Sequence, residues 1–132
     1  QWVPDEFKKN PCFQITSTRE VAKPKEGFPF QLVSNNHMFH IGSYTHYAKA
    51  LTDIGPDCIA ELNPKDAEAL NVIDGDRIVI ESTTQKLEVP ILINTVTVKG
   101  MVYLPKNWVN VPVNMLRNGE EGPISIKISK AN

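Results

Sequence analysis

All three histidines of the chain, His37, His40 and His46, lie within one ten-residue window. An imidazole can bind a metal, transfer a proton, or exchange hydrogen bonds with a polar ligand. Asparagine, serine and threonine residues lie in and beside the window and add further hydrogen-bonding groups. The residue types therefore leave three kinds of site open: a metal site, a catalytic group, and a loop that binds a polar ligand.

A metal site is the first of these alternatives. The spacing His37-x2-His40-x5-His46 provides three nitrogen ligands, and zinc accepts three nitrogens and a water molecule. In a loop, however, this spacing does not fix the geometry, and no cysteine lies beside the histidines. Each metal-bound imidazole would also need an acceptor for its second nitrogen. We therefore expect no metal at these residues.

Sequence signatures of catalysis do not accompany the histidines. The chain has no Ser-His-Asp order, no glycine-rich phosphate loop and no Cys-x-x-Cys motif. Gly42-Ser43 is the kind of dipeptide at which pyruvoyl enzymes cleave themselves, but such a pair occurs easily by chance. We expect no catalytic residue in this domain.

Length and composition exclude several classes of protein. The 132 residues suffice for one domain with a buried core, and a net charge of −1 gives no electrostatic reason to bind nucleic acid. No stretch approaches the roughly 18 apolar residues of a membrane-spanning helix. The chain starts at Gln1 without a targeting pattern, so we expect a piece of a longer polypeptide. Cys12 and Cys58 show no metal-ligand spacing and are interpreted as reduced thiols rather than a disulfide.

Periodicity predicts a mainly β domain. Residues 1–26 contain three prolines and mixed charges and are interpreted as an extended arm or linker, followed by one domain over residues 27–132. In the last strand Ile124, Ile126 and Ile128 alternate with polar residues, so one face is buried. The six expected strands cover residues 28–33, 58–62, 78–82, 86–93, 101–104 and the segment from 124.

Two short helices are expected between the strands. Asn63 suits an N-cap and Pro64 the first helical position, so a helix begins there and ends near Asn71. Asp66 then lies near the positive end of the helix dipole. A second helix is expected over residues 44–52. Short strands with turn signals roughly every ten residues predict a small barrel with inserted helices rather than a doubly wound sheet.

The order of these elements resembles a known family. Residues 62–70, which read LNPKDAEAL, and 73–82, which read IDGDRIVIES, resemble the signature of the molybdopterin dinucleotide-binding domain. That domain ends the large subunits of molybdenum and tungsten oxidoreductases such as formate dehydrogenases and nitrate reductases. The chain also resembles the C-terminal domain of the G subunit of NADH–quinone oxidoreductase (complex I). The resemblance covers about residues 28–130, with matching elements at 100–105 and 113–116, and implies a double-psi β-barrel.

The resemblance also implies where a cofactor would lie. Neutral hydrogen-bond donors contribute only about 0.5–1.5 kcal/mol each, so several must act together. The alternative interpretation is that the side chains implied to bind the cofactor instead hydrogen-bond to one another and cap the 44–52 helix. Trp108 could pack over a ligand, but a core or interface role is preferred. The implied cofactor-binding residues are Ser34, Asn35, His37, His40, Ser43, Thr45 and Asn114.

One departure from the family pattern concerns phosphate binding. Relatives that bind the cofactor usually have Thr or Ser, any residue, then Arg early in the first loop. Here this stretch reads Ser34-Asn35-Asn36 and lacks the guanidinium fork that would hold a pyrophosphate. The sequence is therefore more similar to the G-subunit branch of complex I, where the barrel is retained and the molybdenum cofactor can be absent.

The implied function is that of a C-terminal domain of an oxidoreductase large subunit in electron transport. It would bind or cap the dinucleotide part of molybdopterin guanine dinucleotide, or the space where one once lay, and do no bond chemistry itself. Iron–sulfur clusters would lie elsewhere in the parent chain, whose upstream domains and other redox subunits would be the partners. We expect a cytoplasmic location, peripheral to the membrane through those subunits. The alternatives are a formate dehydrogenase-type domain and a purely structural docking domain.

Overall fold

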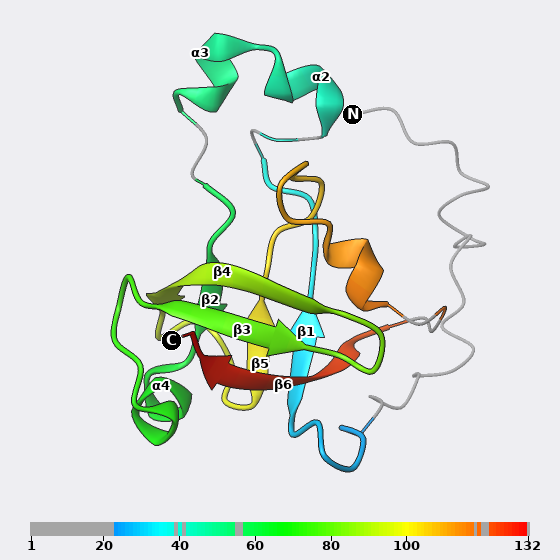
Figure 1. Cartoon of the computed structure of the whole chain (residues 1–132). Coiled ribbons are helices and arrows are strands. Elements are labelled where there is room, and N and C mark those ends of the chain that lie inside the picture. Colours follow the sequence, from blue (N-terminus) through cyan, green and yellow to red (C-terminus); the bar gives the residue numbers. More distant parts are fainter. Residues whose placement is uncertain are drawn as a thin grey trace, which may run out of the picture.

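The computed structural model describes residues 23–38, 40, 42–54, 57–117, 119 and 122–131. Most of the arm predicted over residues 1–26, and Cys12 with it, lies outside this part. Within it, six strands form a closed barrel, as predicted, and the structure gives their order as β1-β5-β2-β4-β3-β6 (Figure 1). The strands are β1 (Phe30–Val33), β2 (Ala60–Leu62), β3 (Arg77–Glu81), β4 (Lys86–Ile93), β5 (Met101–Tyr103) and β6 (Ile124–Lys130).

The strand directions decide where the loops emerge. β1 runs parallel to β5, with Leu32 opposite Val102, and β2 runs parallel to β4, with Leu62 opposite Ile93. Parallel neighbours cannot be joined by a tight turn, so the chain makes long excursions between them. Because β1 and β5 point the same way, the segments that follow them leave from the same end of the barrel (Figure 1).

The barrel interior is apolar because inward positions alternate along each strand. Ile78 and Ile80 of β3 and Val89 of β4 are completely buried. The alternation predicted for the last strand is confirmed, since Ile124, Ile126 and Ile128 are buried while Lys127 and Ser129 are exposed. Burying each such side chain contributes roughly 1.5–3 kcal/mol, and this burial holds the barrel together.

The predicted helix after Asn63 is present as α4 (Pro64–Leu70). The Asn63 side chain accepts a hydrogen bond from the Lys65 N–H at 3.0 Å, and Asn71 ends the helix in the left-handed conformation. Asp66 does more than the predicted interaction with the helix dipole. Its buried carboxylate accepts a hydrogen bond from the Gly100 N–H at 2.6 Å and so ties α4 to the turn before β5.

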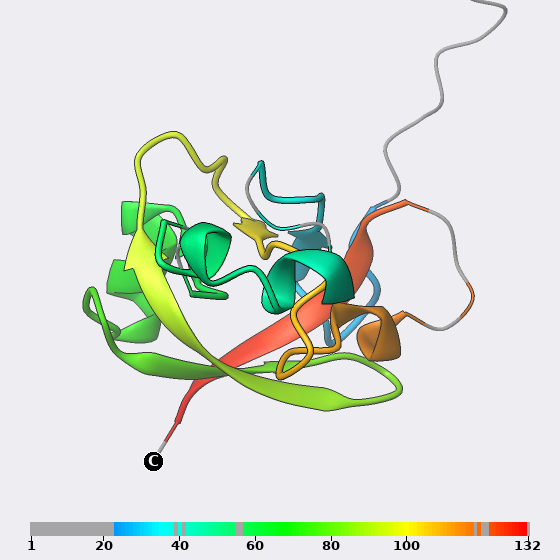
Figure 2. The same ribbon diagram turned by 90° about the horizontal axis from the view of Figure 1, so that it is seen from above.

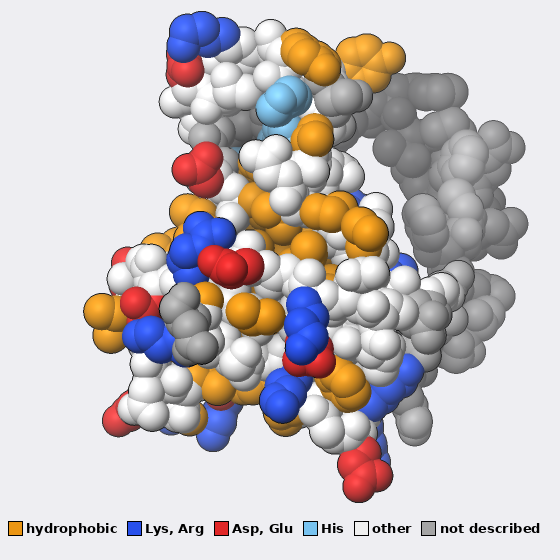
Figure 3. All heavy atoms as spheres, viewed as in Figure 1, with side chains coloured by type: hydrophobic (Ala, Val, Ile, Leu, Met, Phe, Trp, Pro, Cys, Tyr) orange, Lys and Arg blue, Asp and Glu red, His pale blue; other side chains and the backbone are white. Residues whose placement is uncertain are grey.

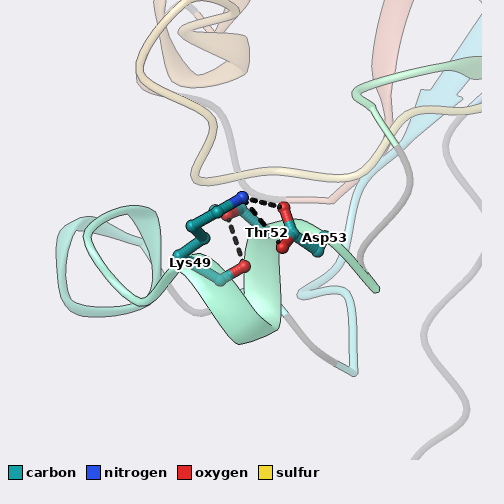
Figure 4. A network of polar contacts seen from close by, with 3 residues as sticks. All are labelled: Lys49, Thr52 and Asp53. Atoms are coloured by element: carbon teal, nitrogen blue, oxygen red, sulfur yellow. Dashed lines mark hydrogen bonds and ion pairs between the residues drawn. The ribbon is translucent and has the colours of Figure 1, made fainter.

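The prediction of one helix over residues 44–52 is wrong. The segment forms two helices, α2 (Ser43–His46) and α3 (Lys49–Thr52), separated by the extended residue Ala48. Helices this short have little stability of their own. The second is closed by local contacts: Lys49 pairs with Asp53 at 3.0 Å, and the Thr52 hydroxyl donates to the Lys49 carbonyl at 2.9 Å (Figure 4).

Strand ends differ slightly from prediction. β1 begins at Phe30 rather than at position 28, because the Phe28 N–H donates to the Lys25 carbonyl and closes a turn. β2, at Ala60–Leu62, is shorter than the expected 58–62. Among the helices of the described residues, none has the length and apolarity needed to cross a membrane.

Candidate functional site

Two loops from parallel strands meet at one end of the barrel. We call residues 34–46, which follow β1, the β1 loop, and residues 104–117, which follow β5, the β5 loop. Backbone and side chain both join them: the Lys106 N–H donates to the Asn35 carbonyl at 3.1 Å, and the Asn107 amide donates to the Asn36 side chain at 2.8 Å. Figure 1 shows α2 and α3 above this end of the barrel, and in Figure 2, seen from above, they lie in front of it.

His40 is the centre of the junction. Its ring is buried, with only 6% of the residue exposed. Nε2 lies 3.0 Å from the Asn107 carbonyl oxygen, and Nδ1 lies 3.0 Å from the Thr45 hydroxyl. Because a carbonyl can only accept, Nε2 carries the proton. In neutral His40, Nδ1 therefore accepts from the Thr45 hydroxyl, and one imidazole fastens both loops.

The Thr45 hydroxyl has a second acceptor within reach. It lies 2.9 Å from the Gly42 carbonyl as well as beside His40. The Thr45 hydroxyl proton therefore lies between two acceptors, Nδ1 of neutral His40 and the Gly42 carbonyl oxygen. Gly42 itself has φ 102°, a conformation that favours glycine, which allows the sharp entry into α2.

Trp108 lies against two imidazoles. Its ring centroid is 4.1 Å from that of His40 and 6.0 Å from that of His37, which it meets edge to face. The indole also packs against the barrel core, in agreement with the packing role predicted for it. The preceding residue, Asn107, has φ 79°, which turns the chain so that its carbonyl faces His40.

A cavity of about 210 Å³ opens beside this cluster. His46 is exposed on the solvent side at the end of α2 and contributes to the cavity wall rather than to the His40 contacts. We call residues 42–54 the α2–α3 segment. Figure 3 shows histidine surface in the upper part of the molecule, between this segment and the barrel. The cavity is lined by His40, His46, Leu51, Thr52, Asp57, Trp108 and Asn110. Its wall therefore combines an aromatic face with carboxylate, amide and hydroxyl groups.

A second cavity, of about 280 Å³, shares Asp57, Trp108 and Asn110 with the first. Cys58 lines it as a free, buried thiol. Burial, with a smaller contribution from the Asp57 charge, raises the pKa of this thiol to about 11. Cys58 is therefore protonated at neutral pH and is no nucleophile. In the described part of the chain, moreover, no three His, Cys, Asp or Glu side chains gather closely enough to hold a metal.

The structure brings together three of the seven predicted site residues: His37, His40 and Thr45. Ser34 lines a different cavity, and Asn35 is exposed, its side chain accepting from the Asn36 N–H. Asn114 is exposed on the 3₁₀ helix η1 (Val113–Leu116). Ser43 begins α2, and its side chain lies outside the described part.

The interpretation that these groups satisfy one another is partly confirmed. Every buried side-chain nitrogen and oxygen of the described residues has a hydrogen-bond partner. The predicted side-chain cap of the helix is wrong, because the N-cap of α2 is Gly42 and no side chain bonds there. The His40 cluster is thus a hydrogen-bonded frame, and His40 and Trp108 of this frame line the cavity.

Sequence reasoning missed Asn107, Asp57 and Asn110 as members of this region. Asp57 and Asn110 come from segments far apart in the chain and meet only because the strands beside them are neighbours in the barrel. The signal for Asn107 was its position between Lys106 and Trp108, in a loop that follows a strand, since asparagine tolerates a positive φ.

Comparison with known proteins agrees with this architecture. Residues 30–129 match the family described as "Molydopterin dinucleotide binding domain". The chain is 28% identical over 98 residues to the second G subunit of the NADH-quinone oxidoreductase of Rhizobium meliloti, covering 74% of this chain and 12% of that protein. It is 31% identical over 103 residues to the F420-dependent formate dehydrogenase subunit alpha of Methanocaldococcus jannaschii, covering 76% and 15%.

Among solved structures, acetylene hydratase from Pelobacter acetylenicus has a similar fold. The TM-score is 0.63 at 21% sequence identity, over 80% of this chain and 19% of that one. The fold and its joined loops define a closed β-barrel of the kind found in that enzyme. The chain belongs to the molybdopterin dinucleotide-binding domain family of molybdenum and tungsten oxidoreductase large subunits, as its sequence predicted. It spans between about an eighth and a seventh of the length of these two curated relatives.

Proposed function

We propose that the β1 and β5 loops hold the nucleotide end of molybdopterin guanine dinucleotide. The observation that carries this proposal is the His40–Thr45–Asn107 frame, which fixes Trp108 beside a cavity with polar walls. A dinucleotide needs an aromatic face for its base and hydrogen-bonding groups around the base edge. Both are present here, so the residues fit the group that the family binds.

The wall of the cavity suits a guanine base in particular. Guanine presents an amino donor on its edge, and the Asp57 carboxylate and the Asn110 amide oxygen can accept from it. Stacking of a base on an aromatic ring contributes about 1–3 kcal/mol. The bound cofactor supplies the redox chemistry through its metal and pterin. This chain's residues orient the nucleotide end and exclude water from it, without a catalytic group of their own.

Within the family we propose a parent chain of the complex I G-subunit type. The support is the similarity to the Rhizobium meliloti protein and the stretch Ser34-Asn35-Asn36, which lacks the arginine that usually holds the pyrophosphate, so that the loops would hold the nucleotide through its base. Such a parent would carry iron–sulfur clusters in upstream domains, bind other redox subunits and work in the cytoplasm, at the membrane through those partners. Residues 1–26 would form the arm that leads from those domains into the barrel of residues 27–132. A formate dehydrogenase-type parent is the alternative, and iron–sulfur and metal-binding cysteines in the rest of the parent chain distinguish the two.

A titration calorimetry experiment with GDP tests the site. Thr45→Val removes the hydroxyl that holds His40 while keeping the side-chain shape. We expect about fivefold weaker GDP binding, because a neutral hydrogen bond contributes about 1 kcal/mol. Thr95→Val, in an exposed turn remote from both loops, is the matched control and leaves the affinity unchanged. Equal affinities of the two variants would contradict the proposed role of the frame.

A docking domain without a ligand is the second candidate. The observation that favours it is the apolar surface on and beside the α2–α3 segment, where Met38, Tyr44 and Tyr47 are more than four-fifths exposed. Surfaces of this kind mark contacts with other proteins or domains. If the wild-type chain shows no heat of binding and no spectral change with millimolar GDP, the docking function replaces the cofactor-binding one.

A further inference from the structure

An apolar groove of about 360 Å³ lies on the outside of the barrel, where β1, β5 and β2 are neighbours (Figure 1). It shares no lining residue with the two cavities beside Trp108. We propose that this outer groove binds an apolar segment, carrying a lysine or arginine, from the remaining polypeptide of the parent subunit. The identity of that occupant rests on the proposed function. The lining includes Val33, Glu61, Val96, Val98, Met101 and Tyr103.

The outward-facing side chains on this side of the barrel are unusually apolar. A strand that is buried on one face and wet on the other is expected to carry polar residues outward, as β6 does with Lys127 and Ser129. In the groove the outward positions of β1 and β5 hold Val33 and Tyr103 instead, and these two residues lie opposite each other. Tyr103 in turn lies opposite Glu61 of β2, so one row of side chains crosses three strands.

The turn between β4 and β5 adds an apolar edge to the groove. Val96 and Val98 of this turn line the groove and are both more than three-fifths exposed. The turn is ordered by hydrogen bonds, because the Asn94 side chain accepts from the Val96 N–H at 3.0 Å and the Asp66 carboxylate accepts from the Gly100 N–H at 2.6 Å. The edge and the strand row form one continuous apolar surface, which is the kind that marks a contact with another segment.

Two polar groups in the groove select the chemistry of the occupant. Glu61 is the only charged residue among the described residues that line it, and its Oε2 accepts from the Asn94 amide at 2.8 Å. Oε1 remains able to accept from a cationic side chain. The Tyr103 hydroxyl has no hydrogen-bond partner among the described residues. An apolar side chain next to a lysine or arginine therefore complements the groove in both shape and charge.

The size of the groove favours an occupant from the same polypeptide. A stable interface between separate proteins buries roughly 800 Å² on each partner, and the lining of the outer groove is far smaller than that. A tethered segment has an effective concentration in the millimolar range, so a small contact suffices. In the two curated relatives the matched region is only 12% and 15% of the protein, which leaves a long chain to supply such a segment.

Hydroxyl-radical footprinting, read by mass spectrometry, tests the proposal on the 132-residue chain and on the purified full-length subunit that contains it. Met101 and Tyr103 should oxidise about tenfold more slowly in the subunit, since an effective concentration ten times the dissociation constant leaves about a tenth of the molecules undocked. Glu61→Lys in the subunit places like charges together and should restore the rates of the free chain. Val98→Asp, at an exposed position, should do the same without touching the Glu61–Asn94 bond.

Glu68→Lys is the matched control, because it reverses one charge at an exposed position of α4 that does not line the groove. It should keep the protection of Met101 and Tyr103. Equal oxidation of these two residues in the free chain and the subunit would overturn the proposal, as would protection that persists in both Glu61→Lys and Val98→Asp.

Two further outcomes would assign the groove to a different occupant and so contradict the proposal. One is protection that appears only when the subunit is assembled with its partners. The other is a dimer of the 132-residue chain in sedimentation that Val98→Asp abolishes.

GDP binding separates this inference from the proposed nucleotide site. If Met101 and Tyr103 are protected in the subunit while GDP leaves the His40 and Trp108 signals unchanged, the outer groove stands and the nucleotide site fails. If GDP binds and depends on Thr45 while Met101 and Tyr103 are not protected, the nucleotide site stands and the outer groove is wrong.

Discussion

The barrel and the α2–α3 segment differ in the burial of their apolar residues. In the barrel, large aliphatic side chains such as Leu62 and Ile80 are completely buried. In the α2–α3 segment, residues 42–54, Tyr44 is 88% and Tyr47 85% exposed. The views in Figures 1 and 2 place this segment above the barrel end, outside the core. Burial therefore holds the barrel, whereas a few hydrogen bonds through Thr45 and His40 hold the segment.

This difference has a functional consequence. The barrel holds β1 and β5 side by side, so that the loops that follow these strands lie next to each other. The loops contribute the polar groups and most of the cavity wall. Changes in the barrel should cost stability, and changes at the junction should cost binding.

The largest expected effect is in the barrel. Leu62→Ala leaves a cavity at a completely buried position between β4 and β5 and should lower the free energy of unfolding by about 2–5 kcal/mol. Tyr44→Ala, in the α2–α3 segment, should change it by less than about 0.5 kcal/mol. Urea denaturation measures both, and similar losses for the two variants would contradict the division.

A smaller loss is expected where α4 is tied to the barrel. Asp66→Ala removes the acceptor of the Gly100 N–H and should lower the free energy of unfolding by about 1–3 kcal/mol. Asp66→Asn keeps an acceptor oxygen and should lose less. If alanine and asparagine gave the same stability by thermal denaturation, the hydrogen bond would not be the cause.

At the junction the stability effect should be local. Thr45→Val should lower the global free energy of unfolding by about 1 kcal/mol or less. Amide hydrogen exchange in α2 should nevertheless rise, because the hydroxyl that joins α2 to His40 is gone. Exchange rates in β3, within the barrel, serve as the internal control. Uniformly faster exchange in β3 and α2 would show that the junction and the barrel unfold as one unit.

The smallest expected effect is a loss of folding stability at alkaline pH. The folded pKa of Cys58 is raised from 9.0 to about 11, so the folded state favours the protonated thiol. The stabilisation is present below pH 9 and is lost as the pH rises toward 11, by about 0.8 kcal/mol at pH 9.5. Burial also raises the pKa of Tyr103, so the comparison must be with Cys58→Ala, which should lack the Cys58 part of the decline. An equal decline in both proteins would contradict the role of Cys58.

Much of the fold could be predicted because its signals are local. Alternating isoleucines at 124, 126 and 128 predict a half-buried strand, and Asn63-Pro64 predicts a helix start. The interruption of the 44–52 helix at Ala48 could not be predicted, since the residues on both sides have reasonable helix propensity. Tertiary contacts through Thr45 compete there with propensity.

The site was predicted less completely, because its members meet through strand register. Asp57 and Asn110 are distant in sequence, and the neighbouring strands β2 and β5 bring them to one cavity. Asp66 was likewise assigned to the helix dipole, because its partner Gly100 lies in another turn.

The most direct test of the central claim is a ¹H–¹⁵N NMR titration of the chain, labelled at histidine and tryptophan, with GDP. Binding at the joined loops predicts saturable shifts of the His40 imidazole and the Trp108 indole, with smaller changes at His37. Thr45→Val should reduce these shifts at the same GDP concentration. Unchanged His40 and Trp108 signals at millimolar GDP, in a chain whose spectrum shows an intact barrel, would contradict the claim.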